Sequence, residues 1–280
     1  TEKRRDMKMR KVILGLVAAT TVLVLTACGS NKKAEPNHYV DQIKDKGTLT
    51  VALNPEFAPF EFQVIKDGKN TIVGSDIDLA NEIGKALGVK VKFQAMDFNN
   101  VLASVESGKA DIAISGISAT PERQKAYDFS TPYYTAKNVM IVQKSQTDTY
   151  QSLSAFDGKK VAAQKGTVQE NIVKEQVKGA NLVSLTKNGQ MINELKNGTV
   201  SGVVFEEPIA KAYVAANPDL SIVTDISFDS SKSDSYAIAM PKDSGNLKKE
   251  IDKVITQLKA DGKIEEFVKT NFELSQASAK

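Results

Sequence analysis

Residues 115–123 have the sequence Ser-Gly-Ile-Ser-Ala-Thr-Pro-Glu-Arg and follow a short apolar run at residues 112–114 that is typical of a buried strand. Thr120 stands where an N-cap is favoured, and Pro121 suits the first helical position because its missing N–H costs no hydrogen bond there. A strand that leads into a glycine, hydroxyl side chains and a helix start presents backbone N–H groups to an anion. Arg123 adds a planar fork of donors that suits a carboxylate. The segment therefore predicts a carboxylate-binding site. The alternative is an ordinary strand–turn–helix connection whose arginine pairs with a surface acid.

Residues 1–27 are typical of a bacterial signal peptide. A basic stretch precedes an apolar run at residues 12–27 that is too short for a comfortable membrane span. The run ends in Leu-Thr-Ala-Cys-Gly, and Cys28 in this motif is the only cysteine of the chain. The motif resembles a lipobox, which implies that Cys28 carries a lipid and begins the mature protein; the alternative is a plain signal peptide with a chance cysteine. Residues 1–6 precede the first methionine and fit translation upstream of the true start.

Without residues 1–27 the chain is close to neutral. The whole chain has 37 Lys and Arg and 34 Asp and Glu, and residues 1–27 hold six of the basic and two of the acidic residues. This balance does not favour a nucleic-acid partner. The single histidine, His38, and the single cysteine leave no set of ligands for a histidine-based metal site and no catalytic triad or free thiol. We therefore expect no metal and no cofactor.

The remainder of the chain alternates strand-like and helix-like segments. The strand-like segments are residues 49–53, 89–93, 112–114, 139–143, 160–163, 182–185, 202–205, 221–223 and 236–240. The helix-like segments are residues 39–46, 76–87, 99–107, 168–177, 191–195, 207–216, 247–258 and 264–270. Such alternation with short links predicts an α/β fold with parallel or mixed sheets flanked by helices.

The order of these segments predicts two lobes joined by two crossovers, because the chain builds one α/β unit, then a second, and then returns. Lobe 1 is predicted over residues 39–135 and 236–275, lobe 2 over 139–224, and the hinge crossovers over 134–138 and 225–235. Residues 28–38 are predicted to be a lipid-anchored tether and residues 276–280 a flexible tail. In such a fold, the ligand binds between the lobes, where strand ends meet helix starts.

Seven segments spaced along the chain form a recognisable set. They are Val-Ala-Leu-Asn-Pro-Glu-Phe-Ala-Pro-Phe-Glu-Phe at 51–62, Val-Gly-Ser-Asp-Ile-Asp-Leu at 73–79, Asp-Phe-Asn at 97–99, the opening stretch at 115–123, Asp-Phe-Ser-Thr-Pro-Tyr-Tyr at 128–134, Gly-Thr at 166–167 and Phe-Glu-Glu-Pro at 205–208. With the lipobox, this set resembles the polar amino-acid family of substrate-binding proteins that serve ABC importers, over nearly all of residues 47–272.

The resemblance implies a type II periplasmic-binding-protein fold with two Rossmann-like lobes that close about the two hinge crossovers. It implies a monomer that captures a free L-amino acid outside the cytoplasmic membrane, held there by the lipid on Cys28, and delivers it to an ABC permease. The rival functions are a dehydratase or lyase on the same fold and an adhesion or signalling lipoprotein. We expect no enzyme, because Glu206 would be committed to the ligand and His38 lies in the tether.

The resemblance also implies a ligand-binding set: Asn54, Glu56, Phe57, Phe98, Ser115, Gly116, Ser118, Arg123, Thr167 and Glu206. In this set Arg123 binds the α-carboxylate, with the backbone N–H of Ser118 and a hydroxyl or N–H of Thr167. Glu206 binds the α-ammonium, with the carbonyl of Gly116. A zwitterion taken out of water needs partners at both ends, because an unpaired buried charge is very costly.

The same residues have plainer interpretations. Phe57 and Phe98, which would flank the ligand side chain, fit core residues as well, and Thr167 fits a simple N-cap. Glu206 fits a solvated acid and can exchange roles with Glu207.

The sequence says little about which amino acid is bound. The resemblance places Asn54 where the far end of the ligand side chain is recognised, and basic-amino-acid relatives often have an aspartate there. Glu56 either supplies the missing negative charge or is a solvent-facing loop acid. We expect a basic amino acid, arginine first, with glutamine or another neutral polar amino acid as the alternative.

Overall fold

The computed structural model describes residues 38–229 and 234–278, which belong to one compact unit. The predicted signal peptide, Cys28, residues 28–37 of the tether and residues 230–233 of the second crossover lie outside the described residues. Within the described ranges, every helix is too short or too polar to cross a membrane.

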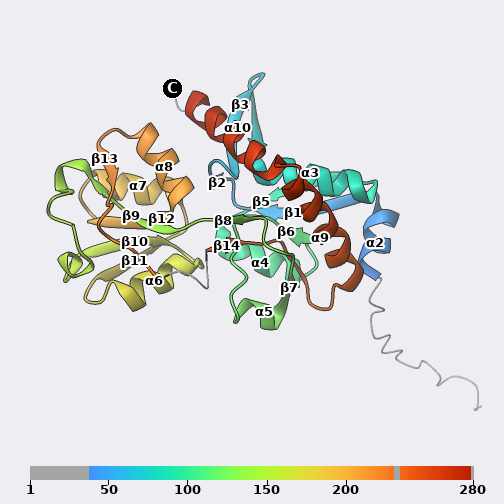
Figure 1. The fold of residues 1–280 in the computed structure, drawn as a ribbon, viewed down its shortest axis with the longest axis horizontal. Coiled ribbons are helices and arrows are strands. Elements are labelled where there is room, and N and C mark those ends of the chain that lie inside the picture. Colours follow the sequence, from blue (N-terminus) through green and yellow to red (C-terminus); the bar gives the residue numbers. More distant parts are fainter. Residues whose placement is uncertain (1–37, 230–233, 279–280) are drawn as a thin grey trace, which may run out of the picture. The chain divides into compact units, whose positions relative to one another are not determined.

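The elements follow one another as strands and helices in alternation (Figure 1). The described α-helices are α2 (His38–Lys46), α3 (Ser75–Leu87), α4 (Phe98–Glu106), α5 (Arg123–Ala126), α6 (Val168–Gln176), α7 (Asn188–Lys196), α8 (Glu207–Ala216), α9 (Gly245–Ala260) and α10 (Lys263–Ser278). Two 3₁₀ turns are η2 (Lys144–Gln146) and η3 (Leu153–Phe156). The described strands are β1 (Thr48–Leu53), β2 (Glu56–Phe57), β3 (Glu61–Lys66), β4 (Lys69–Val73), β5 (Lys90–Ala95), β6 (Ile112–Ala113), β7 (Tyr127–Phe129), β8 (Tyr134–Thr135), β9 (Asn138–Gln143), β10 (Lys160–Gln164), β11 (Asn181–Leu185), β12 (Gly202–Glu206), β13 (Leu220–Ile222), β14 (Ser235–Tyr236) and β15 (Ala239–Pro241).

Two five-stranded mixed sheets organise the two lobes. The sheet of lobe 1 has the order β5-β1-β6-β15-β7, in which β1 is parallel to β5 and β6 while β15 is antiparallel to β6 and β7. The sheet of lobe 2 has the order β11-β10-β12-β9-β13, in which β10 is parallel to β11 and β12 while β9 is antiparallel to β12 and β13. The prediction of an α/β fold with two sheet-containing lobes is confirmed.

Small and large residues alternate along the strands of lobe 1. The small residues face one side of the sheet and the large residues face the other, and different helices pack on the two sides. Ala52, Ala113 and Ala239 pack with Val101 and Val105 of α4 in one apolar cluster. The larger neighbours of these alanines face the opposite way and pack against α3 and α9, through Val51, Ile112, Ile238, Met240, Leu79, Ile83, Ile251 and Ile255. Both faces are buried, so these strands are continuous apolar runs.

The two predicted crossovers pair with one another. Tyr134 and Thr135 of β8 form a two-stranded antiparallel sheet with Ser235 and Tyr236 of β14. Aromatic rings also pack here, because the centroid of Tyr236 lies 5.8 Å from that of Tyr134 and 5.1 Å from that of Phe60.

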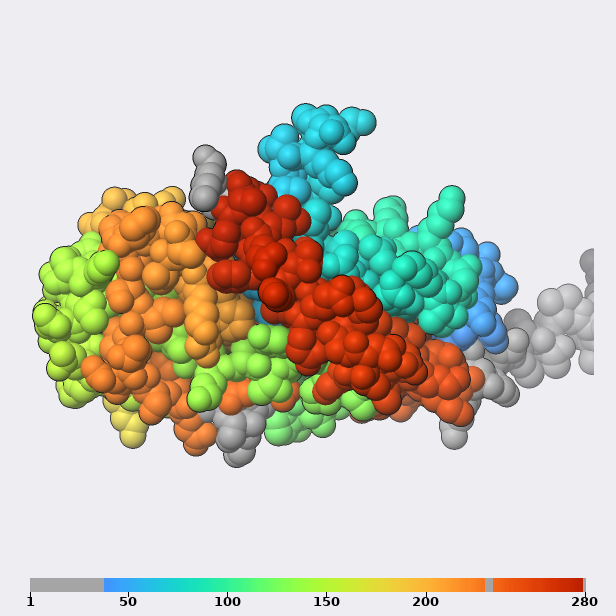
Figure 2. Space-filling model, turned by 45° about the horizontal axis from the view of Figure 1, so that its top comes forward, coloured from blue at the N-terminus to red at the C-terminus, as the bar shows by residue number. Residues whose placement is uncertain are grey.

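A β-hairpin over β3 and β4 was not predicted. Its strands are antiparallel and meet at Asp67 and Gly68, both with positive φ, as a two-residue Asp-Gly turn requires. Figure 2 shows the hairpin standing out beside α10, which contacts β3. The Asp-Gly pair in the sequence would have allowed the hairpin to be predicted.

The helix expected after the opening stretch begins later than predicted. Helix α5 starts at Arg123 and has four residues, although Thr120 still receives a hydrogen bond from the N–H of Arg123 at 3.3 Å. The predicted N-cap side chain therefore closes a turn that precedes the helix. At the other end of the chain, α10 extends to Ser278, beyond residue 276 where the tail was expected to begin.

Candidate functional site

Five strand ends converge on one cavity between the lobes. The segments after β1, β5 and β6 contribute from lobe 1, and the ends of β10 and β12 contribute from lobe 2. Ligands of α/β proteins bind at the carboxyl ends of such strands. The cavity is lined by Phe57, Phe98, Gly116, Ser118, Arg123, Gln164, Thr167, Val168, Gln169, Val204, Phe205 and Glu206.

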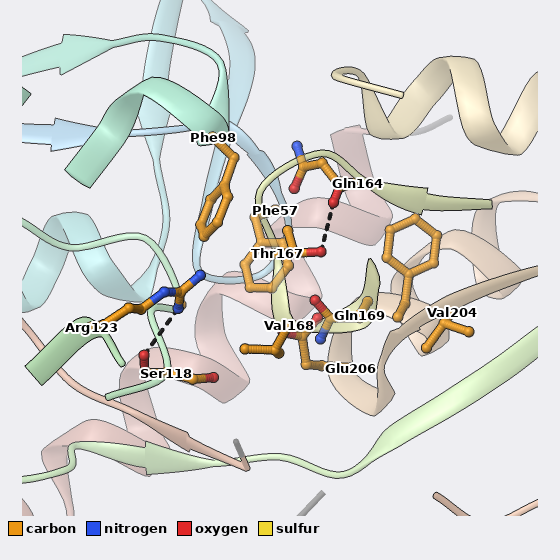
Figure 3. A pocket seen from close by; sticks show the side chains of 12 residues that line it. Phe57, Phe98, Ser118, Arg123, Gln164, Thr167, Val168, Gln169, Val204 and Glu206 are labelled. Carbon is orange, nitrogen blue, oxygen red and sulfur yellow. Dashed lines mark hydrogen bonds between the residues drawn. The ribbon is translucent and has the colours of Figure 1, made fainter. Parts of the chain in front are cut away.

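The cavity is contracted. Its volume is about 20 Å³, enough for about one water molecule. Figure 3 shows Phe98, Arg123 and Ser118 approaching it from one side and Gln164, Gln169 and Glu206 from the other. A ligand of amino-acid size therefore needs side-chain rotation or separation of the lobes in order to enter.

Arg123 joins the two lobes at the cavity. Its Nη1 donates to the carbonyl oxygen of Ser118 at 2.9 Å, and its Nη2 donates to that of Gly166 at 3.0 Å (Figure 3 marks the first). The guanidinium carbon lies 5.9 Å from the ring centroid of Phe98. Burial lowers the pKa of Arg123 and the charge of Glu206 opposes this shift. A fork of donors held beside an aromatic face suits a carboxylate.

Glu206 is the acidic residue of the cavity. It is 4% exposed, and burial raises its pKa to about 7, while Gln169 and Arg123 act to lower it. Glu206 ends β12, opposite Asn138 of β9, and Asn138 accepts a hydrogen bond from Gln169 Nε2 at 2.5 Å. A buried carboxylate in this position is poorly compensated, so a cationic group in the cavity would stabilise it.

Phe57 and Gly116 form a tight contact in the wall of the cavity. Gly116 has φ +54°, and a Cβ on it would lie 2.5 Å from Cε1 of Phe57. Phe57 also packs against Phe60 and Tyr236, with centroid separations of 5.9 and 6.2 Å. Phe57 is thus both a core residue and a residue of the cavity. Phe98 is half-buried.

Thr167 lies in the cavity as the N-cap residue of α6. Its hydroxyl donates to the carbonyl oxygen of Gln164 at 2.6 Å, and its N–H points to the same oxygen at 3.3 Å (Figure 3).

Asn54 and Ser115 lie behind the cavity wall. Asn54 Oδ1 accepts from Gln164 Nε2 at 2.9 Å, which connects the two lobes, and Asn54 Nδ2 donates to the carbonyl of Met96 at 3.0 Å. The Ser115 hydroxyl accepts from the N–H of Asn54 at 3.0 Å and donates to Glu61 Oε1 at 2.6 Å. Neither residue lines the cavity.

Glu56 also lies outside the cavity, in an interlobe ion-pair cluster with Asp97, Lys187 and Asn188. Lys187 Nζ lies 3.1 Å from Glu56 Oε1 and 2.6 Å from Asp97 Oδ1. The N–H of Asn188 donates to Glu56 Oε2 at 2.9 Å, and its Nδ2 donates to the Glu56 carbonyl at 3.0 Å. In this arrangement Glu56 connects the lobes and does not face the ligand cavity.

Five lining residues were missed in the sequence: Gln164, Val168, Gln169, Val204 and Phe205. Gln164 is the last residue of β10 and Phe205 is the next-to-last residue of β12, so the rule that ligands bind at the carboxyl ends of strands would have found both. Within residues 38–229 and 234–278, no group of three or more His, Cys, Asp or Glu side chains is arranged to hold a metal ion.

Comparison with known proteins agrees with this geometry. Residues 49–273 match the family model of the bacterial extracellular solute-binding proteins, family 3. The chain is 55% identical to AbpA from Streptococcus pneumoniae, an amino acid ABC transporter substrate-binding protein whose crystal structure contains L-arginine, with a TM-score of 0.81 over 84% of this chain and 98% of that one. It is 34% identical to the arginine-binding extracellular protein ArtP of Bacillus subtilis over 94% of this chain and 98% of ArtP. It is 35% identical to a probable histidine-binding protein of Campylobacter jejuni over 76% of this chain and 80% of that protein. These relatives are binding proteins and not enzymes.

Proposed function

This chain belongs to family 3 of the bacterial extracellular solute-binding proteins, and we propose that it captures free L-arginine and delivers it to an ABC importer. The observation that carries the proposal is that Arg123, which is half-buried, and Glu206, which is buried, are opposite in charge and line one cavity between the lobes. One end of a zwitterion pairs with each of them. Charge-assisted hydrogen bonds of about 1.5–3 kcal/mol each offset the desolvation of the ligand.

The lining of the cavity supports a basic side chain. The rings of Phe57 and Phe98 each add about 0.5–2 kcal/mol for a cation placed over them. Gln164 in the lining carries an amide oxygen of the kind that accepts guanidinium N–H groups, and Asn54 behind it accepts a hydrogen bond from the Gln164 amide nitrogen. Arginine is also the ligand in the AbpA structure and in the name of ArtP.

A neutral or weakly basic polar ligand is the second candidate. The Asn54–Gln164 pair contributes amides and no carboxylate, and the Campylobacter jejuni relative is named for histidine. In this case the Arg123 and Glu206 roles stay the same and the specificity changes.

A thermal-shift panel of the twenty amino acids plus ornithine tests the proposal. A ligand that binds only the folded state adds about 2.7 kcal/mol of unfolding free energy at a hundredfold excess over Kd. We expect the largest shift with arginine and smaller shifts with lysine and ornithine. A shift with glutamine or histidine alone would make that amino acid the ligand in place of arginine. If no amino acid causes a shift, the proposed amino-acid binding is contradicted.

Arg123→Lys tests the carboxylate clamp directly. Lysine keeps the charge but cannot form a bidentate pair, so we expect Kd to rise at least about tenfold in calorimetry. Lys125→Ala, on the same short helix and exposed, is the matched control and leaves Kd unchanged.

Anchoring through a lipid on Cys28 and action as a monomer belong to the same proposal. The lipobox motif supports the anchor. Cys28→Ser is expected to move the protein from the membrane fraction to the soluble extracytoplasmic fraction, and retention at the membrane would contradict the anchor.

A further inference from the structure

Two carboxyl side chains are completely buried behind the wall of the cavity. Glu61 is 0% exposed and Asp76 is 1% exposed. The backbone forces them together, because the N–H of Asp76 donates to the carbonyl of Phe60 at 2.9 Å and that of Ser75 donates to Pro59 at 3.1 Å. Gly74 permits this approach, since a Cβ there would lie 1.9 Å from the Phe60 oxygen. The start of α3 is therefore fixed against the start of β3.

Each of the two carboxyl groups has one oxygen with donors and one without. Glu61 Oε1 accepts from the Ser115 hydroxyl at 2.6 Å. Asp76 Oδ2 accepts from the Tyr133 hydroxyl at 2.9 Å and from the N–H of Gly116 at 3.4 Å. Glu61 Oε2 and Asp76 Oδ1 are buried without a donor among the described residues, and the two side chains lie within hydrogen-bonding reach of each other. A single proton shared between the two carboxyl groups would provide a partner for buried oxygens that otherwise have none.

We propose that Glu61 and Asp76 share one proton and act as a positioning pair that fixes residues 115–116 in the cavity wall. The contacts run directly to the site. Ser115, held by Glu61, accepts the N–H of Asn54, and Gly116, held by Asp76, lies against Phe57 in the cavity. The pair thus acts on the ligand through the backbone of residues 115–116, and this part of the inference depends on the proposed function.

The electrostatic surroundings favour the shared proton. The ionisable groups that face the pair are Tyr133 and Tyr236, which are buried, and Glu206, whose charge adds to the repulsion. Burial raises the pKa of Asp76 to about 6, and burial together with the charge of Asp76 raises the pKa of Glu61 well above its usual value. A second negative charge in this place would have no compensating cation among these groups, so it is disfavoured.

The pair predicts a definite pH dependence. The folded protein holds a proton that the unfolded chain has lost above the ordinary carboxyl range, so stability from this proton is present at lower pH and is lost as pH rises through the raised pKa of Glu61. Two adjacent carboxylates then repel, residues 115–116 lose their fixed position, and ligand affinity falls. Ionisation of Glu206 acts on affinity in the opposite direction, so a comparison with a variant of Glu61 separates the two effects.

Infrared spectroscopy of the ligand-free protein tests the proton itself. Because the pKa of Glu206 is also raised, to about 7, the spectra are compared in a Glu206→Gln background, which at about pH 7 is expected to show the C=O stretching band of a protonated carboxyl group. Glu61→Gln is the key variant, because its amide donates to Asp76 Oδ1 and accepts from Ser115 as the protonated acid does; the band is then absent. Asp76→Asn, which offers an amide donor to Glu61, serves if the first variant does not fold. Glu82→Gln, on the same helix as Asp76 and partly exposed, is the matched control and keeps the band. Absence of the band from the Glu206→Gln protein, or a band that persists when each pair variant is added to that background, would overturn the proposal.

Calorimetry with L-arginine tests the positioning role between about pH 6 and about pH 8. We expect the ratio of the wild-type Kd to that of Glu61→Gln to increase with pH, at most about tenfold per pH unit, the limit for one linked proton. If the protonated-carboxyl band is present but the ratio of the two Kd values does not change with pH, the positioning role is overturned. A band in a protein that binds no amino acid would leave the shared proton standing and reject the proposed function.

Discussion

Glu206 is the residue whose protonation acts most directly on the cavity. Its pKa is raised to about 7 by burial, and a ligand ammonium requires its ionised form. Affinity for arginine is therefore expected to increase as pH rises from about 5 to about 7, by at most about tenfold per pH unit, with release of a proton on binding. In the ligand-free protein the same raised pKa means that stability falls as pH rises through this window.

Calorimetry in two buffers of different ionisation enthalpy measures the released proton. Glu206→Gln is expected to bind weakly and without pH dependence in this range. Glu207→Gln is the matched control, because Glu207 is the next residue and pairs with Lys211 at 2.7 Å on the surface. If Glu207→Gln is the variant that loses binding, the two glutamates have exchanged roles.

The residues of the cavity differ in how far the sequence revealed them. Arg123, Glu206, Phe57 and Phe98 belong to spaced motifs, and the structure brings them into one lining. Gln164 belongs to no such motif. It lines the cavity because the end of β10, where it lies, faces lobe 1 in the folded protein. The partners of Glu56 were not accessible either, since Lys187 is 131 residues away in the sequence and only the fold brings them together.

Helix α7 is the element that connects lobe 2 to the ion-pair cluster. Lys187 precedes its first residue, and Asn188, which is 0% exposed, donates two hydrogen bonds to Glu56. The salt bridges are partly exposed, with the Lys187 side chain 51% exposed, so each contributes about 0.2–1 kcal/mol. Since the cluster joins the lobes, its loss is expected to favour their separation.

Lys187→Met tests this cluster. We expect a roughly two- to fivefold faster dissociation of arginine with little change in the association rate, as measured by stopped flow. Lys46→Met is the matched control: Lys46 pairs with Asp111 at 2.7 Å inside lobe 1 and is 46% exposed. An equal effect of both variants on dissociation would contradict a role specific to the interlobe contacts.

Helices and strands whose apolar residues recur at a clear spacing were predicted, and those without such a spacing were missed. The alternation of apolar runs and amphipathic segments identified α3, α4, α9 and the central strands to within a few residues. The hairpin of β3 and β4 was missed because its strands are mostly half-buried or exposed and lack a strong apolar pattern. The strand β7 was missed because three residues are too few to show a period.

The two lobes are held together by contacts of two kinds. The crossovers β8 and β14 are paired with each other, and α10 contacts both α3 of lobe 1 and α8 of lobe 2. The other contacts are polar and lie in or beside the cavity, from Arg123 to Gly166, from Gln164 to Asn54 and from Lys187 to Glu56. Hinge motion about paired strands keeps the first kind and breaks the second.

We propose that the lobes of the ligand-free protein separate in solution and close around the ligand, because the cavity, about 20 Å³ in volume, is too small to admit an amino acid. The contacts across the cavity must therefore open before an amino acid enters and must form again around it. We expect small-angle scattering to show a smaller radius of gyration with saturating arginine than without it, because the ligand in the proposed site would bridge Arg123 of lobe 1 and Glu206 of lobe 2. Glu206→Gln provides the matched comparison, since it removes one side of that bridge and leaves the hinge intact; its radius is expected to change little at the same arginine concentration.

If the wild-type radius stays the same when calorimetry shows the site to be full, the ligand enters by side-chain rotation in a closed protein. The rates of binding would then be set by Arg123 and Phe98 and not by the hinge.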